Sequence, residues 1–223
     1  MTYSQIHSPS YHWKSQFLCR ATSLRFPKTL PMAYIPLDNS TAEIERQIQG
    51  HPFIKSLRSD PSLRESRYYT HVPDSLRPQM FTTGNLLGAE KIPVPPIAFY
   101  NKGGTSFVMI LYIGTSLSGY PGMTHGGLLA TVMDEGLAGC ASSALPARVG
   151  VTMHLSVHYR KPAPTDSFYM LKARTVKLDG KIAGVEGRIE TLDDLQVGEG
   201  QVVAEGDGQY LQPPSTRGLY PPY

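Results

Sequence analysis

The chain has 223 residues, of which 40% are hydrophobic and 17% charged, as expected for one soluble globular domain with an extension. The formal net charge is only +3 and the basic residues are scattered, which argues against a nucleic-acid partner. The apolar runs are too short to span a bilayer. Cys19 and Cys140 are too few for a disulfide framework, so a reducing compartment is expected.

Residues 1–37 form a basic leader. They contain no Asp or Glu, but they hold Lys14, Arg20, Arg25 and Lys28 among many Ser, Thr and aromatic residues. This composition resembles a mitochondrial transit peptide, and a disordered, incidentally basic N-terminus explains it equally well. We therefore expect a mitochondrial protein, with a cytoplasmic location as the alternative.

Residues 38–95 are predicted to form an irregular N-terminal arm that carries short helices. The segment Ser40-Thr-Ala-Glu43 fits a capping box, which predicts a helix that ends at Gly50. A second short helix is expected over Phe53–Arg58, before the Asp60-Pro61 stop. The rest of the arm is rich in proline, so we expect it to be mostly irregular and to wrap around the domain.

The compact domain is predicted to span residues 96–212, with a tail over residues 213–223. An apolar run at Phe107–Ile113 indicates a buried strand. Four further strands are indicated by period-two alternation and by the hairpin signal Asp179-Gly180. They cover Val149–Tyr159, Phe168–Leu178, Lys181–Leu192 and Val202–Leu211. In the first of these four, the alternation places Thr152 on the polar face with the histidines.

Between the first two strands, Tyr120–Ser143 is predicted to form a tight turn followed by one buried helix. Pro121-Gly122 is a turn signal, and the apolar run from Gly126 onward contains no proline. At helical pitch the large apolar side chains cover one broad arc, comprising Leu128, Leu129, Val132, Met133, Leu137 and Cys140. Only Thr131 and Glu135 are expected to face water. One helix among five antiparallel strands is an α+β layout.

One carboxylate, Asp134, interrupts the small-residue side of this helix. No Lys or Arg occurs between Gly126 and Ala147, so no cation one helical turn away can pair with it. A buried, unpaired carboxylate is costly, and such acids gather at functional sites. A backbone cap, an exposed position or an ion pair from distant sequence explains a single Asp equally well.

The residues around Asp134 carry a resemblance to a known family. His125-Gly126-Gly127, with Asp134 nine positions after the histidine, resembles the signature of hotdog-fold acyl-CoA thioesterases. The string from Gly119 to Asp134 is similar to the thioesterase superfamily member 4 and PaaI-like branch and its fungal relatives. The resemblance implies a hotdog fold, in which an antiparallel sheet of about five strands wraps one long central helix, and it implies acyl-CoA hydrolysis.

Two glycines at the helix start suit an oxyanion site. Gly126 and Gly127 open the helix, so their N–H groups lack intrahelical acceptors, and without a Cβ they permit close approach of a substrate. The resemblance assigns the oxyanion donor to the Gly126 N–H and gives His125 the role of orienting the turn. It makes Asp134 the nucleophile or the general base.

The resemblance also implies roles outside this turn. Thr152 matches the Ser or Thr that positions water, although an ordinary strand Thr explains it as well. Arg160 and Lys161 match a strand end where relatives hold basic residues near the CoA phosphates, and solvated charges are the alternative. Gly127 and Glu135 are the remaining candidates on the substrate side, and Glu135 is the second candidate for the base.

The family shares the Asp of one protomer with the glycine turn of the other, which implies a homodimer or a dimer of dimers. No metal or cofactor is expected beyond the CoA of the substrate, because His154 and His158 lie about 13 Å apart on a strand. Two alternatives stay open. One is a hydrolase of carrier-bound acyl or polyketide chains, whose pocket Gly206 and Gly208 would widen, and the other is a non-catalytic dimer that binds acyl-CoA.

Overall fold

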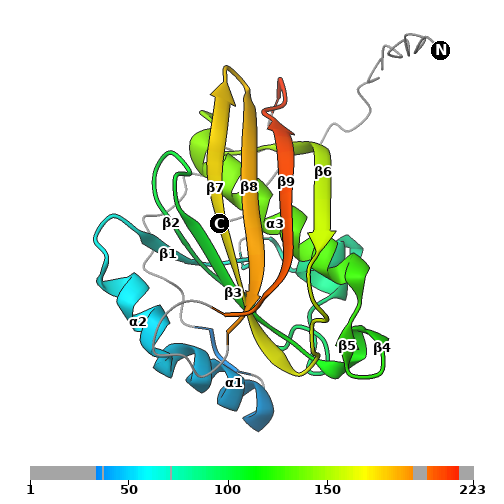
Figure 1. The fold of residues 1–223 in the computed structure, drawn as a ribbon. Coiled ribbons are helices and arrows are strands. Elements are labelled where there is room, and N and C mark those ends of the chain that lie inside the picture. Colours follow the sequence, from blue (N-terminus) through cyan, green and yellow to red (C-terminus); the bar gives the residue numbers. More distant parts are fainter. Residues whose placement is uncertain (1–33, 37, 71, 193–199, 216–223) are drawn as a thin grey trace, which may run out of the picture.

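The computed structural model describes residues 34–36, 38–70, 72–192 and 200–215 (Figure 1). The expectations for most of the basic leader and for most of the C-terminal tail lie outside the described residues. Cys19 also lies outside them.

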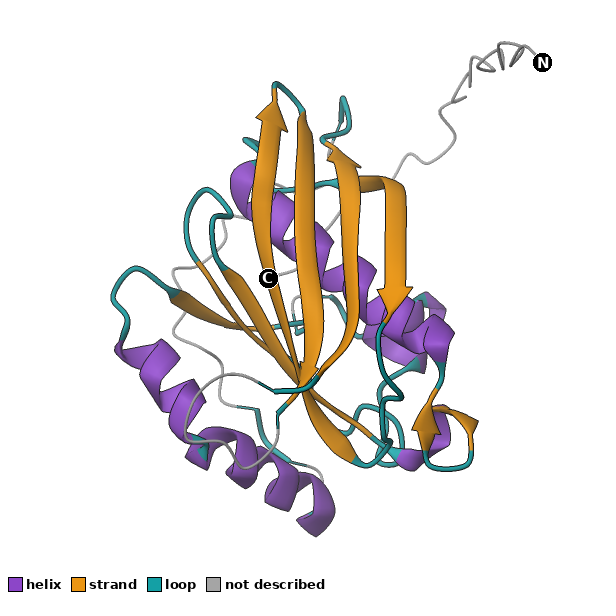
Figure 2. Ribbon diagram, in the orientation of Figure 1, coloured by secondary structure: helices purple, strands orange, loops and turns teal. Residues whose placement is uncertain are grey.

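One antiparallel sheet of seven strands forms the centre of the fold, in the order β1-β2-β3-β7-β8-β9-β6. All five predicted strands are present: β3 (Phe107–Ile113), β6 (Val151–Tyr159), β7 (Ser167–Asp179), β8 (Ile182–Thr191) and β9 (Val202–Leu211). Two short strands, β1 (Arg64–Arg67) and β2 (Ile97–Tyr100), extend the sheet beyond β3 (Figure 2). β1 comes from the proline-rich arm, so part of the arm belongs to the sheet.

The central helix α3 (Gly126–Ala144) packs against one face of this sheet and runs behind it in Figure 1. Its predicted apolar arc is buried throughout, because it faces β3 and β7–β9. Gly136 allows a close approach, since a Cβ at this position would lie 2.3 Å from the Leu171 side chain. The predicted α+β architecture, a long helix against an antiparallel sheet, is therefore confirmed.

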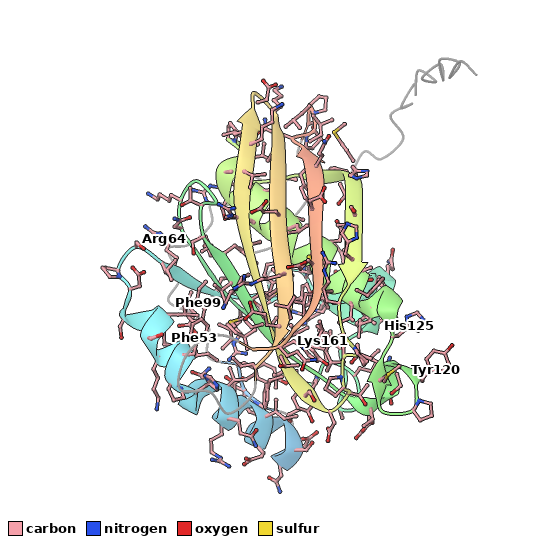
Figure 3. All side chains as sticks on the ribbon, viewed as in Figure 1. Phe53, Arg64, Phe99, Tyr120, His125 and Lys161 are labelled. Carbon is pink, nitrogen blue, oxygen red and sulfur yellow. The ribbon has the colours of Figure 1, made fainter. Side chains whose placement is uncertain are left out.

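A second layer covers the other face of the sheet at β2, β3 and β7. It consists of α1 (Asn39–Gly50) and α2 (Pro52–Ser59), seen at the lower left in Figure 1. Ile48, Ile54, Phe99, Ile110 and Met170 form a separate buried core there. Figure 3 shows Phe53 and Phe99 close to this layer. Burial on both faces explains why β3 is a continuous apolar run rather than an alternating one.

The predicted cap of the first helix is displaced by two residues. The N-cap is Asp38, whose carboxylate accepts the backbone N–H of Thr41 at 2.8 Å. The Asp38 N–H in turn donates to the hydroxyl oxygen of Thr41. These two residues therefore form the capping box, and Ser40 lies inside the first turn. The carboxylate at position 38 therefore starts the helix, and the expected start at Ser40 was wrong.

Strand β6 departs from the predicted alternation. Its register with β9 shifts between Thr152 and His154, which indicates a β-bulge. The extra residue turns Thr152 toward α3, on the same side as Leu155 and Tyr159, instead of leaving it beside the histidines. The predicted orientation of Thr152 was wrong for this reason, and the correction brings its hydroxyl to the helix.

Candidate active site

His125 forms the N-cap of α3, directly after the short hairpin of β4 (Ser118–Tyr120) and β5 (Met123–Thr124). Its Nδ1 accepts the backbone N–H of Gly127 at 2.9 Å, and its own N–H donates to the carbonyl of Leu117 at 2.9 Å. The imidazole is therefore tied to the backbone on which it sits. This geometry suits a residue that holds the turn, as the resemblance implies.

Gly126 presents an N–H group that donates to no described residue. The Gly127 N–H is taken by His125, so Gly126 carries the donor that remains at the helix start. The Gly126 carbonyl accepts the hydroxyl of Tyr159 at 2.8 Å, which anchors the helix start to the end of β6. A free N–H at the positive end of a helix is well suited to a developing negative charge.

A hollow of about 610 Å³ opens beside this turn. It is lined by four of the predicted site residues, His125, Gly126, Arg160 and Lys161, together with apolar neighbours that include Tyr120. Figure 3 shows Tyr120 and His125 at the same end of the molecule. The glycine turn and the two residues that the resemblance assigns to the CoA phosphates therefore border one space, which we call the CoA hollow after that expected ligand.

The two basic residues of the CoA hollow differ in their pairing. The Nε of Arg160 lies 2.6 Å from a carboxylate oxygen of Glu205 on β9. Lys161 forms no ion pair with any described residue. Lys161 is therefore the cation that is available to an incoming anion without the loss of an existing pair.

Asp134 lies farther along α3 and is half-buried. The hydroxyl of Thr152 donates to its Oδ1 at 2.9 Å, and the hydroxyl of Tyr210 approaches the same oxygen at 3.2 Å. Within the described part of the chain, Asp134 forms no ion pair, and its Oδ2 accepts no hydrogen bond. The structure thus joins two predicted residues, Asp134 and Thr152, and adds a third that was not predicted.

Tyr210 is that third residue, and it is fully buried on β9. A polar aromatic residue on the inward face of the last strand was the available signal in the sequence. The glycines of this strand leave no open space on the side that Met133 and Tyr210 occupy. A Cβ at Gly206 would lie 3.1 Å from Met133, and a Cβ at Gly208 would lie 2.8 Å from the Tyr210 hydroxyl, so side chains already fill both places.

Glu135 does not face water as expected. The side chain is half-buried, and burial is the main cause that raises the pKa of its carboxyl to about 7. A hydrogen bond with Thr82 opposes the rise, and the charge of Asp134 adds to it. The reason is the arm: Thr82 belongs to the helical turn at Phe81–Asn85, and Tyr68 donates its hydroxyl to the Glu135 carbonyl at 2.8 Å.

The predicted site is therefore divided into two parts within one chain. Gly126 belongs to the CoA hollow, whereas Asp134, Thr152 and Tyr210 form a separate group that we call the acid cluster. Gly126 and Asp134 are eight residues apart on α3, which is roughly 12 Å at 1.5 Å per residue.

Two features are absent from the described residues. Among them, no three His, Cys, Asp or Glu side chains are grouped closely enough to hold a metal ion. No helix in this part of the chain has the length and apolar character needed to cross a membrane.

Comparison with known proteins places the chain in a family. The family model of the thioesterase superfamily matches residues 121–197, which include the turn, α3 and strands β6–β8. A UPF0644 protein of Schizosaccharomyces pombe is 31% identical over 176 residues, covering 79% of this chain and 67% of that protein. The chain belongs to the thioesterase superfamily, and its long helix against an antiparallel sheet is the hotdog fold.

Two more relatives carry informative names. A mitochondrial protein of Candida albicans is 30% identical over 146 residues, covering 66% of each chain. The acyl-coenzyme A thioesterase THEM4 of Rattus norvegicus is 28% identical over 149 residues, covering 63% of this chain and 62% of that protein. The chain thus spans about two thirds of the length of these curated relatives.

Proposed function

We propose that this protein is a thioesterase that hydrolyses acyl-CoA to a carboxylic acid and free CoA. The observation that carries the proposal is the acid cluster: Asp134 is held at Oδ1 by two hydroxyls, while Oδ2 is left open. It lies on the same helix whose first N–H, that of Gly126, has no acceptor among the described residues. Membership of the thioesterase superfamily and similarity to the acyl-coenzyme A thioesterase THEM4 support this reaction and this substrate class.

The chemistry requires a donor for the carbonyl oxygen and a base or nucleophile for the carbonyl carbon. As the carbon becomes tetrahedral, its oxygen gains negative charge, which the Gly126 N–H and the start of α3 stabilise. Asp134 either attacks the carbon itself or removes a proton from the attacking water. The carbon–sulfur bond then breaks, and the thiolate takes up a proton to give free CoA. If Asp134 is the nucleophile, the acyl group is left on its carboxylate as an anhydride, which a water molecule then hydrolyses to release the carboxylic acid and restore Asp134.

A single chain cannot bring these groups together. A base must be within about 3 Å of the atom that it serves, but Gly126 and Asp134 lie roughly 12 Å apart along one helix. We propose a homodimer, or a dimer of such dimers, in which Gly126 faces the partner subunit's Asp134. Support comes from β6, an edge strand on which Val151, Met153 and Tyr159 are 47%, 55% and 54% exposed.

The CoA hollow would receive the phosphates of the substrate. Lys161 is our main candidate for this contact, because Arg160 already pairs with Glu205. We also propose that the protein works in the mitochondrion, which agrees with the name of the Candida relative and with the composition of the leader. The glycines that motivated the carrier-protein alternative give it no support on the side of Met133 and Tyr210, which occupy the space beside them.

The test is the release of free thiol from a panel of acyl-CoAs of different chain lengths, with the same acyl groups on a carrier protein for comparison. Asp134→Asn should lower kcat by about 10²-fold or more, as for the loss of a catalytic base. Asp207→Asn is the matched control, since Asp207 is an exposed carboxylate on β9. Undiminished turnover by the Asp134 variant, or tight acyl-CoA binding with no turnover by the wild type, would overturn the proposal.

A further inference from the structure

We infer that Tyr210 is a positioning residue for the proposed hydrolysis: its buried hydroxyl and that of Thr152 fix one carboxylate oxygen of Asp134 and leave the other free to react. This inference rests on the proposed function, because it assigns a role within the same acid cluster. It adds to the site a residue of the last strand, which belongs neither to α3 nor to the histidine–glycine turn.

The two hydroxyls come from paired residues on two neighbouring strands. Thr152 on β6 is the direct register partner of Tyr210 on β9. The bulge that follows Thr152 turns it toward α3, so both side chains meet Asp134 from the sheet side. They approach Oδ1 at 2.9 and 3.2 Å. Two donors on one oxygen restrict rotation of the carboxylate and present Oδ2 in a defined direction.

The tyrosine must be the donor in this contact. An ionised carboxylate only accepts hydrogen bonds, so the proton belongs to the phenol. Burial raises the pKa of Tyr210, and the charge of Asp134 raises it further, so the phenol keeps its proton at physiological pH. The phenol can therefore donate to Oδ1 while Oδ2 is left for the reaction.

The neighbouring glycines place the ring where it is needed. A Cβ at Gly208 would lie 2.8 Å from both the ring and the hydroxyl of Tyr210, so only glycine leaves room for the ring to turn inward. On the other side, a Cβ at Gly150 would lie 3.2 Å from the Tyr210 Cβ. Glycine at both positions therefore leaves the room that the Tyr210 side chain occupies, and a Phe at position 210 would keep this packing while it removes the hydroxyl alone.

A purely structural explanation competes with this role. The Tyr210 hydroxyl also lies 3.4 Å from the main-chain carbonyl of Asp134, and a buried hydroxyl requires some acceptor in any case. If the hydroxyl served only to satisfy itself, its removal would lower stability and leave the reaction unchanged. The experiment must therefore separate turnover from folding.

Tyr210→Phe is the variant, and Tyr169→Phe is its matched control. Tyr169 is also fully buried, and its hydroxyl bonds to the carbonyl of Pro164 rather than to the acid cluster. We expect Tyr210→Phe to lower kcat for acyl-CoA about tenfold with little change in KM, as for the loss of a partner behind a reactive group. Tyr169→Phe should leave kcat unchanged. In an Asp134→Asn background, Tyr210→Phe should cause no further loss of residual activity, because it acts through the carboxylate.

A wild-type kcat in Tyr210→Phe, or an equal loss in the Asp134→Asn background, would overturn the positioning role. A double-mutant cycle of stability, measured without substrate, tests the contact separately. The shifts in unfolding midpoint of Tyr210→Phe and Asp134→Asn should not add up to the shift of the double variant. Additive shifts would also overturn it. A wild-type protein that releases no thiol from any acyl-CoA would instead refute the proposed function and with it this role in catalysis, whereas the cycle would still report the contact.

Discussion

The Nδ1 atom of His125 accepts the backbone N–H of Gly127 at 2.9 Å, so the histidine side chain closes the first turn of α3 on itself. The Gly126 N–H, one residue earlier, is left without an acceptor among the described residues. Of two adjacent N–H groups, that of Gly127 is bonded to the cap, and that of Gly126 is left open.

This relationship predicts the effect of changing the cap. His125→Ala should lower the free energy of unfolding by about 1 kcal/mol, the usual cost of losing an N-cap, and should lower kcat because the turn loosens. His125→Asn should recover most of the stability, since Asn is a strong N-cap residue. Chemical denaturation and steady-state kinetics measure the two effects. Equal stability of the Ala and Asn variants would contradict the capping role.

A second prediction concerns the shared site. Gly126→Pro removes only one N–H, because proline is favoured at the first helical position and the extended backbone of His125, with φ −62 and ψ 130, suits a residue before proline. Loss of this donor should lower kcat by about 10²-fold or more. Equal mixing with Asp134→Asn chains should restore about a quarter of wild-type activity, because half of the dimers are mixed and each holds one intact site.

Subunit exchange must be shown for that mixture, for example with chains that carry two different affinity tags. The control is a mixture in which one chain carries both substitutions and the other is Asp134→Asn, which contains no intact site. Proven exchange without recovery of activity, or a fully active monomer in sedimentation, would count against a site formed by two chains.

The difference between Arg160 and Lys161 predicts unequal contributions to substrate binding. Lys161→Ala should raise KM for acyl-CoA about fivefold, which corresponds to ~1 kcal/mol for an exposed charge pair. Arg160→Ala should have a smaller effect, because its guanidinium is paired with Glu205. The KM of a short acyl thioester without phosphates should be unchanged in both variants. An equal rise of KM for that thiol ester would show that Lys161 acts on something other than the phosphates.

Glu135 predicts a pH dependence of stability. Burial raises the pKa of its carboxyl in the folded protein from the ordinary 4.5 to about 7, so the folded state binds the proton more tightly than the unfolded chain does. The free energy of unfolding should therefore fall as pH rises between these two values, through the loss of this proton. Glu135→Gln should lack this contribution. The free energy of unfolding of the wild type and of Glu135→Gln is measured by denaturation from pH 4 to 8. The difference between these two free energies should change between the two pKa values, and a constant difference would refute the assignment.

Local sequence patterns determined the frame of this protein. The hairpin of β7 and β8, the last strand β9 and the apolar arc of α3 were predicted correctly, because each of these patterns lies within one element or one turn. The spacing of His125, Gly126 and Asp134 also identified the family. These residues belong to one continuous helix and its cap, so their spacing in the sequence fixes their spacing in the structure.

The tertiary structure alone decided how the site is completed. Thr152 reaches Asp134 only because a bulge changes the register of β6 with β9, and register depends on two strands that are far apart in the chain. Tyr210 is contributed by the last strand. Glu135 is partly shielded from solvent because residues of the arm pack against α3. Periodicity shows which side of an element is buried, but the partner that buries it is selected by contacts between distant segments, which local sequence does not encode.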